Sequence, residues 1–385
     1  MGLPKTADVV IIGGGVMGAS TAYHLAKRGC PDVLLLERER FFGTQATGKC
    51  AGGIRHQFGT EINVQLSQLS LPMLHRFEEE LEQPIDLNLC GYLFLLTEQE
   101  DAEVFRQNID MQRRLGVKTE WLEPSEIADL VPLIDLHSVL GGSFNRDDGL
   151  ADPSSVVQGY VSGAGRLGAS LLTDVEVTDI LVTNGRVTGV TTDRGAVSTP
   201  IVVNAAGPWA GVVGEMAGLE IPVAPLRRQI VVTGPIPEVP DDFPFVIDFA
   251  QSLYFHPEGE GILTGMSNPN ESYGFDQSVD KDWELVHLGA AVERMPILER
   301  AGLANRWAGL YEVSPDAHPI LGRVLQLDGF YCINGFSGHG FMHGPACGLL
   351  LAEEILDGKA GSLDISCLHL DRFQEGGEII EYNVV

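Results

Sequence analysis

The first forty residues combine two apolar runs with a glycine-rich turn and one helical pattern. Residues 8–12 and 32–37 are short apolar runs typical of buried strands, and residues 19–28 have the pattern of a helix. Between the first run and the helix stand Gly13-Gly14-Gly15-Val16-Met17-Gly18. This order of strand, glycine turn, helix and strand predicts a βαβ unit, whose strands lie parallel in one sheet.

The patterns that follow predict a second sheet and a later return to the first. Residues 61–81 form a charge-rich helical region, and the apolar run 91–96 predicts a strand of another sheet. A meander and then another buried parallel strand of the first sheet are predicted by three later runs, at residues 175–182, 187–191 and 201–204. Alternating apolar residues and prolines at 225–240 predict a second departure from the first sheet. We therefore expect two lobes, each assembled from separate stretches of chain.

The composition is that of a globular protein that does not bind nucleic acid. The 385 residues suffice for two packed lobes, and 25 basic against 53 acidic residues give a formal charge of −28, which repels phosphate backbones and anionic lipid surfaces. The six cysteines contain no C-x-x-C pair, so we expect neither a zinc site nor a disulfide framework. No apolar stretch has signal-peptide or membrane-spanning length, which favours a soluble cytoplasmic protein.

The glycine turn has the spacing of a dinucleotide-binding motif. Gly13 permits the tight turn, Gly15 lets the backbone approach a pyrophosphate, and Gly18 allows the helix to pack closely on the strand. The free N–H groups at the start of the helix favour phosphate. Glu37, at the end of the second strand, is placed to accept hydrogen bonds from both ribose hydroxyls, which disfavours NADP. The turn alone does not separate FAD from NAD.

Four later segments carry a family resemblance that covers essentially the whole chain. They are Gly48-Lys49-Cys50-Ala51-Gly52-Gly53-Ile54-Arg55, Asn204-Ala205-Ala206-Gly207-Pro208-Trp209, Gly309-Leu310-Tyr311 with Ser314-Pro315-Asp316, and Gly335-Phe336-Ser337-Gly338-His339-Gly340-Phe341. Together they resemble the D-amino-acid-oxidase-like FAD-dependent oxidoreductases. The branch most similar contains sarcosine oxidase, dimethylglycine dehydrogenase and the β subunit of dye-linked L-proline dehydrogenase, and segments 54–59 and 90–96 are most like the last of these.

The resemblance implies an α/β (α+β) fold with two domains. A discontinuous, Rossmann-like FAD/NAD(P)-binding domain would take residues 1–90, 150–220 and 305–385, and a substrate domain with a mixed sheet would take residues 91–149 and 221–304. It also implies which residues bind FAD, with Thr47 to Gly53 wrapping the flavin and diphosphate, and Val177 meeting the adenine. The full set is Gly13, Gly14, Gly15, Val16, Met17, Gly18, Glu37, Arg38, Thr47, Gly48, Lys49, Cys50, Gly52, Gly53, Val177, Ala205, Ala206, Gly207, Trp209, Gly309, Gly338, His339, Gly340, Phe341 and Met342.

The last glycine segment supports flavin binding on physical grounds as well. Gly335, Gly338 and Gly340 remove side chains where a backbone must approach a large flat group, and a helical pattern follows over about residues 343–356. The N-terminus of such a helix, pointed at the flavin, would stabilise the negative charge that reduction creates. His339 and His343 have the spacing of two metal ligands, but no carboxylate follows, and we expect no metal. Ser337 lacks the context of a hydrolase nucleophile.

Arg55, Tyr254, Tyr311 and Met342 are the candidate substrate residues. The resemblance places Arg55 where the sarcosine oxidases bind the substrate carboxylate, and the planar guanidinium suits a bidentate pair. Tyr254 and Tyr311 fall at active-site tyrosines of that family. The plainer alternatives are a surface arginine and two core tyrosines with satisfied hydroxyls. Amine oxidation by a flavin needs an oriented neutral amine and a fixed carboxylate, and no protein nucleophile.

Three departures separate the chain from monomeric sarcosine oxidase. Met342 stands where that enzyme has a lysine, which removes a second cation. Gly309 stands where it has a cysteine bonded to FAD, so noncovalent FAD is expected. Ser267 aligns roughly with its active-site histidine. The methionine agrees better with the β-subunit pattern.

The expected function is FAD-dependent oxidation of the C–N bond of a small secondary amino or imino acid, such as sarcosine or L-proline, in amino acid catabolism. Two alternatives stay open: an FAD-dependent hydroxy-compound dehydrogenase, and a flavin-bound assembly subunit without activity. The electron acceptor is either oxygen or a redox partner. The resemblance to L-proline dehydrogenase implies a heteromeric partner, with a second flavin at the interface. A homo-oligomer is the alternative, and the sequence does not distinguish between the two assemblies.

Overall fold

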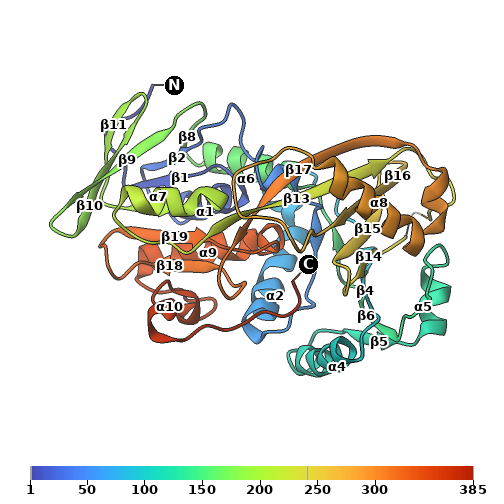
Figure 1. The fold of residues 1–385 in the computed structure, drawn as a ribbon. Coiled ribbons are helices and arrows are strands. Elements are labelled where there is room, and N and C mark those ends of the chain that lie inside the picture. Colours follow the sequence, from blue (N-terminus) through green and yellow to red (C-terminus); the bar gives the residue numbers. More distant parts are fainter. Residues whose placement is uncertain (1, 241, 385) are drawn as a thin grey trace.

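Two sheets lie side by side in the computed structural model, which describes residues 2–240 and 242–384 (Figure 1). The first has six strands in the order β18-β19-β12-β1-β2-β8. All neighbours are parallel except β18 and β19, and Ile11 lies opposite Leu35 on one side and Val203 on the other. The strands are β1 (Val9–Ile12), β2 (Val33–Leu36), β8 (Ser170–Leu172), β12 (Val202–Asn204), β18 (Ile320–Arg323) and β19 (Phe330–Asn334).

Helices cover the first sheet because its strands are apolar on both faces. α1 (Val16–Lys27) packs against α6 (Pro153–Arg166) and α9 (Gly340–Asp357), and α2 (Glu61–His75) packs against α9. A side chain at Gly348 of α9 would overlap Ser20 of α1, so this glycine lets the two helices approach closely. The remaining elements here are α3 (Phe77–Leu81), α7 (Ala210–Met216), α10 (Arg372–Glu375) and the meander β9 (Val177–Thr183), β10 (Arg186–Thr192) and β11 (Gly195–Ser198).

The second sheet has eight strands in the order β17-β13-β16-β15-β14-β4-β6-β5. It is mixed, because β14 pairs with β4 in parallel while the other pairs are antiparallel. The strands are β4 (Tyr92–Leu96), β5 (Glu120–Leu122), β6 (Gly141–Asn145), β13 (Ala224–Thr233), β14 (Phe245–Asp248), β15 (Leu253–Glu258), β16 (Gly261–Met266) and β17 (Leu303–Val313). Its helices are α4 (Gln99–Arg114), α5 (Pro124–Leu130) and α8 (Lys281–Arg294). A separate ribbon pairs β3 (Gly53–Ile54) with β7 (Gly149–Leu150).

The architecture confirms the expected α/β class, and it corrects several boundaries. α1 begins at Val16 and α9 at Gly340, each three residues earlier than expected, because both helices start within their glycine segments. The region 61–81 forms two helices with a break at Arg76. The strands of each sheet come from the segments assigned to one domain, with one exception. β17 pairs with β13 in the second sheet, although its residues 305–313 fall in the segment assigned to the FAD-binding domain.

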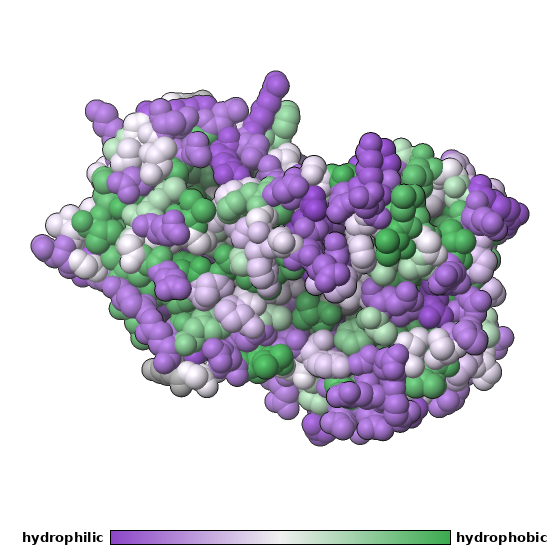
Figure 2. All heavy atoms as spheres, in the orientation of Figure 1, coloured by the Kyte–Doolittle hydropathy of each residue, from purple (hydrophilic) through white to green (hydrophobic). Residues whose placement is uncertain are grey.

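The surface mixes polar and apolar side chains, as Figure 2 shows for one face, where hydrophilic residues separate small hydrophobic areas. Among the residues that the structure describes, no helix is long and apolar enough to span a membrane.

Candidate active site

One cavity extends from the glycine turn of the first sheet to the inner face of the second. Its lining includes nearly every residue that the sequence assigned to cofactor or substrate. The exceptions are Gly18 and Gly48. A side chain at Gly18 would overlap the carbonyl oxygen of Gly13, and one at Gly48 would overlap that of Gly43. These two glycines therefore allow close backbone packing behind the cavity. For Gly18 this is the close packing of the helix that the motif predicts.

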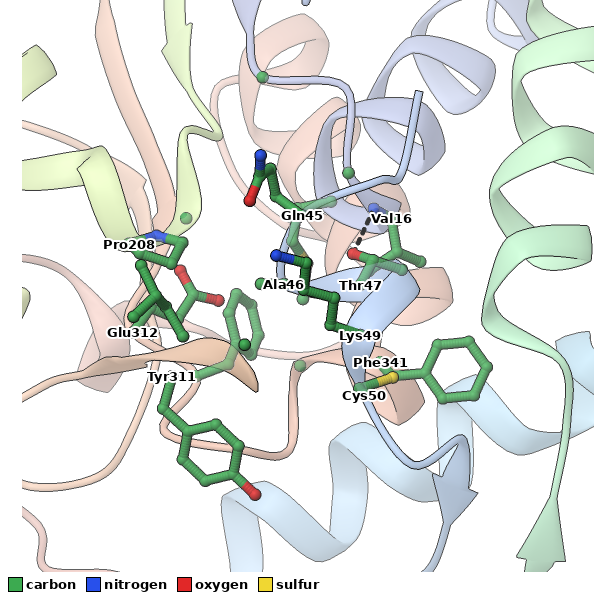
Figure 3. Close-up of a pocket in the computed structure, with 18 of the residues that line it drawn as sticks. Val16, Gln45, Ala46, Thr47, Lys49, Cys50, Pro208, Tyr311, Glu312 and Phe341 are labelled. Atoms are coloured by element: carbon green, nitrogen blue, oxygen red, sulfur yellow. Dashed lines mark hydrogen bonds between the residues drawn. The ribbon is translucent and has the colours of Figure 1, made fainter. Parts of the chain in front are cut away.

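The glycine turn is held by backbone geometry that other residues do not adopt easily. Gly13 has a φ of +109°, and a side chain there would overlap the carbonyl of Ala205 at the end of β12. The backbone N–H of Val16, in the first turn of α1, donates to Thr47 Oγ1 at 3.2 Å (Figure 3). The turn, the end of β12 and the segment around Thr47 thus meet at one end of the cavity.

Glu37 follows β2 and faces the same end of the cavity. Its Oε2 accepts from Gly14 N at 2.7 Å and its Oε1 from Glu39 N at 2.8 Å. Each carboxylate oxygen has further capacity to accept a ligand hydroxyl. Burial raises the pKa of Glu37, and the two backbone donors act against this rise. The carboxylate is therefore fixed in place before any ligand binds.

Replacing Glu37 by Ala is expected to weaken FAD binding. A hydrogen bond to a charged group contributes about 1.5 to 3 kcal/mol, which is roughly tenfold to more than a hundredfold in the dissociation constant for one lost ribose contact. Titration of apoprotein with FAD, followed by flavin fluorescence, measures the change. An unchanged dissociation constant would remove Glu37 from the cofactor site.

β17 and the segment between β16 and α8 cover the cavity on the side of the second sheet. The indole N–H of Trp307, in β17, donates to Lys49 O at 3.0 Å, and the Lys49 ammonium donates to Gln277. Farther along, the guanidinium of Arg38 lies 4.0 Å from the ring centre of Trp209, which stacks on Phe275. The cavity is therefore covered by β17 and by the segment between β16 and α8. Figure 3 shows Glu312 and Pro208 on the opposite side of this view from Thr47 and Lys49.

The surroundings of Gly309 favour noncovalent flavin. A Cβ at this position would lie 3.0 Å from the Cβ of Lys49, and Gly309 offers no thiol. Burial raises the pKa of the nearby Cys50 thiol to about 11, which suppresses the reactive thiolate. Precipitation of the holoprotein in acid should therefore release all the flavin into the supernatant. Yellow colour that stays with the washed polypeptide would contradict this expectation.

The end of the cavity under the second sheet is lined by tyrosines. Tyr92, Tyr254 and Tyr311 all face it, and burial raises the pKa of each phenol. Gly338 has a φ of +102°, and its Cβ would lie 2.5 Å from Cε2 of Tyr311, so only glycine allows this approach. The three phenols are neutral hydrogen-bonding groups at neutral pH.

Arg55 is a buried cation at this end of the cavity. Its side chain is 4% exposed, and its guanidinium carbon lies 3.9 Å from the ring centre of Phe58. The guanidinium donates to the carbonyl of Gln57 and, at 2.6 Å, to that of Asn383. Among the described residues, no carboxylate forms an ion pair with Arg55. Burial accordingly lowers its pKa. A buried cation without a counter-ion, at a cavity wall, is suited to bind an anion.

The C-terminal segment of residues 377–384 completes this end, which the sequence did not indicate. Figure 1 shows it running from α10 to a point between the two sheets. The buried Glu381 carboxylate accepts from Gly59 N at 2.6 Å, Thr60 Oγ1 at 2.7 Å and Asn63 Nδ2 at 2.9 Å. Asn383 then reaches Arg55, and Val384 lines the cavity. The only sequence signal is a polar residue pattern near the terminus, which is too weak to predict this contact.

The segment before α9 brings further titratable groups to the cavity. His339 lines it, and its Nε2 lies 2.9 Å from Ala317 O while its Nδ1 lies 3.3 Å from His343 Nδ1. Met342 is buried and also lines the cavity. Glu312, in β17, belongs to none of the motifs that indicate the site, and its carboxylate accepts from Gly335 N at 3.1 Å. Burial raises the pKa of Glu312 to about 7.

Comparison with known proteins gives one family and several relatives. The family model described as FAD dependent oxidoreductase (DAO) matches residues 8–354. Human mitochondrial sarcosine dehydrogenase is 32% identical over 376 residues, covering 93% of this chain and 40% of that protein. The chain thus spans about two fifths of the length of this curated relative.

Two solved structures have the same fold over nearly their whole length. L-proline dehydrogenase from P. horikoshii is 35% identical with a TM-score of 0.91, and the match covers 98% of this chain and 100% of that one. Glycine oxidase from Geobacillus kaustophilus is 25% identical with a TM-score of 0.85, covering 96% and 99%. Each therefore shares the fold of this chain over nearly its whole length.

Proposed function

Because the chain belongs to the DAO family of FAD-dependent oxidoreductases, we propose that it oxidises the C–N bond of a small secondary amino or imino acid, such as sarcosine or L-proline, to an imine. The observation that carries the proposal is that Arg55 is a buried cation at the end of the cavity opposite the glycine turn, where none of the described carboxylates pairs with it. The relatives named for sarcosine, proline and glycine support this class of substrate.

The residues of the cavity fit FAD. The turn at Gly13 to Gly15 leaves room for a pyrophosphate at the start of α1, Glu37 offers acceptors for ribose hydroxyls, and the glycines before α9 admit a flat ring. Bound FAD supplies the acceptor for a hydride. The protein supplies binding, orientation and electrostatics.

Arg55 would hold the substrate carboxylate. Its two terminal amino groups each carry two N–H bonds, and the carbonyls of Gln57 and Asn383 fix the plane of the guanidinium. The remaining N–H bonds are free to pair with a carboxylate. Tyr254 and Tyr311 would pack on the carbon skeleton and direct a hydroxyl to a polar group. Together they would place the α hydrogen for transfer, the step for which orientation contributes most.

The start of α9 would stabilise the negative charge that reduction of a bound flavin creates. Gly340 opens the helix, and its first N–H groups have no acceptor within the helix. A helix N-terminus contributes about 0.3 to 2 kcal/mol to a nearby negative charge. This interaction favours the reduced state over the oxidised state.

Anaerobic reduction of the holoprotein tests the proposal without requiring the identity of the electron acceptor. A panel of N-methyl and cyclic amino acids is added, and the flavin absorbance is followed. We expect sarcosine, L-proline or a close relative to bleach the flavin. Bleaching by hydroxy compounds alone would indicate a hydroxy-compound dehydrogenase. A flavin that dithionite reduces but no member of either panel reduces would indicate a subunit without catalytic activity.

A further inference from the structure

Two adjacent arginines in β13, Arg227 and Arg228, face opposite sides of the second sheet, as neighbouring residues of a strand do. Arg227 points away from the cavity and is fully paired. It binds Glu271 at 3.1 Å and Asp276 at 2.9 Å, and Asp280 lies 3.8 Å away. Arg228 lines the cavity and, among the described residues, forms no ion pair with any carboxylate.

The hydrogen bonding of Arg228 is incomplete. One terminal amino group donates to Arg227 O at 3.1 Å, while the buried Nε has no acceptor in the described part of the chain. A buried donor without an acceptor is unfavourable, and at the wall of a cavity it has room to bind an acceptor on a ligand. The missing partner of a guanidinium is an anion with acceptor oxygens.

Arg228 lies among the residues assigned to the substrate. Its guanidinium carbon is 5.1 Å from the ring centre of Tyr311, and in the sheet it pairs with Gly309. Burial raises the pKa of the Tyr254 and Tyr311 phenols, and the positive charge of Arg228 acts against that rise in both. Arg55 affects Tyr311 in the same direction. Two positive charges, one from β13 and one from the segment after β3, therefore act on the Tyr311 phenol.

We propose that Arg228 is a second anion-binding residue of the substrate site, and that the substrate is an acid held by Arg55 and Arg228 together. The inference rests on the proposed function, since it adds to the same site. The anionic group at Arg228 is either the carboxylate that Arg55 also binds or a second acidic group of a dicarboxylic amino acid. Both have the same chemistry, a carboxylate facing a guanidinium.

The test uses ligands that cannot reduce the flavin, so that it does not depend on catalysis. Acetate, pyrrole-2-carboxylate and succinate are titrated into the oxidised holoprotein, and the change in flavin absorbance gives each dissociation constant. Pyrrole, which lacks the carboxylate, is the neutral reference. For Arg228→Met we expect carboxylate binding to weaken roughly tenfold to a hundredfold, the range for charged hydrogen bonds, with pyrrole unaffected. Arg228→Lys should restore part of the loss.

Arg227→Met is the matched control, because it removes the neighbouring cation on the other face of the strand. It should leave the ratio of carboxylate to pyrrole affinity unchanged. Equal losses for the two monocarboxylates and succinate in Arg228→Met would assign both arginines to one carboxylate, whereas a larger loss for succinate would assign Arg228 to a second acidic group. Equal changes for carboxylates and pyrrole, no change at all, or loss of FAD from Arg228→Met would overturn the proposal.

The outcome is separable from that of the proposed function. If no amino acid reduces the flavin while Arg228→Met still weakens carboxylate binding, the anion site stands and the oxidation of amino acids fails. If amino acids reduce the flavin of Arg228→Met with wild-type affinity, the oxidation of amino acids stands and the role of Arg228 in binding the substrate fails.

Discussion

Arg55→Met is expected to weaken binding of the amino-acid substrate by roughly thirtyfold to several-thousandfold, while FAD stays bound. Methionine keeps much of the bulk of the arginine stem but removes the charge and the planar set of donors. Truncating one partner of a desolvated charge pair costs about 2 to 5 kcal/mol, and each 1.4 kcal/mol is a factor of ten. The carbonyls of Gln57 and Asn383 lose their donor as well.

Anaerobic titration with the best substrate and with its decarboxylated amine measures this effect. The acid should lose far more affinity than the amine, because only the acid carries the group that Arg55 binds. Arg106→Met is the control, since Arg106 also stacks on an aromatic ring, at 3.7 Å from Trp121, but is exposed on α4. If the acid and the amine lose the same affinity in Arg55→Met, Arg55 has only a structural role.

Asp316→Ala should destabilise the fold by about 3 to 5 kcal/mol, the range for breaking a buried ion pair from one side. Asp316 accepts from Arg372 Nε at 2.8 Å and Nη2 at 3.0 Å, and both residues are at most 5% exposed. Burial opposes ionisation of Asp316, but the contacts with Arg372 and His318 together outweigh it, and the pKa is lowered. The contribution is therefore present above the ordinary pKa of an aspartate and is lost as the pH falls through the lowered value.

Denaturant unfolding of holoprotein at saturating FAD measures this loss. Asp328→Ala is the comparison, because the Asp328–Arg186 pair lies at the surface, with both side chains about two thirds exposed. Exposed pairs contribute about 1 kcal/mol or less. A loss in Asp316→Ala no larger than in Asp328→Ala would show that the buried pair does not hold α10 in place. The backbone N–H of Glu381 donates to Asp316 O, so the same region anchors the segment that reaches Arg55.

The cofactor half of the site could be predicted from sequence because its signals are local. Apolar runs flank the Gly13 to Gly18 turn, and Glu37 follows the next strand, so a few consecutive residues define both geometry and chemistry. The family match confirms the resemblance that these motifs and the later glycine segments carried. The helix starts were placed too late because glycine lowers helix propensity, although α1 and α9 both begin within glycine segments.

The substrate half could not be predicted to the same depth because it is assembled across the chain. Asn383 meets Arg55 from more than three hundred residues away, and Glu312 meets Gly335 only because β17 lies beside the segment before α9. Arg227 and Arg228 are adjacent and identical in sequence. The fold shows that Arg227 pairs with acidic residues on the outer side of the sheet, whereas Arg228 faces the cavity and pairs with none of the described carboxylates.

In the proposed reaction the substrate loses a hydride from the carbon beside its nitrogen. Single-turnover anaerobic reduction of the flavin tests this step. It is measured with the amino acid that bleaches the flavin best and with the same compound deuterated at that carbon. We predict that both compounds reduce the flavin fully and that the deuterated one does so more slowly at saturating concentration. Two results would contradict hydride transfer from this carbon. One is equal reduction rates for the two compounds when reduction of the flavin limits the rate. The other is that no amino acid reduces a flavin that dithionite reduces.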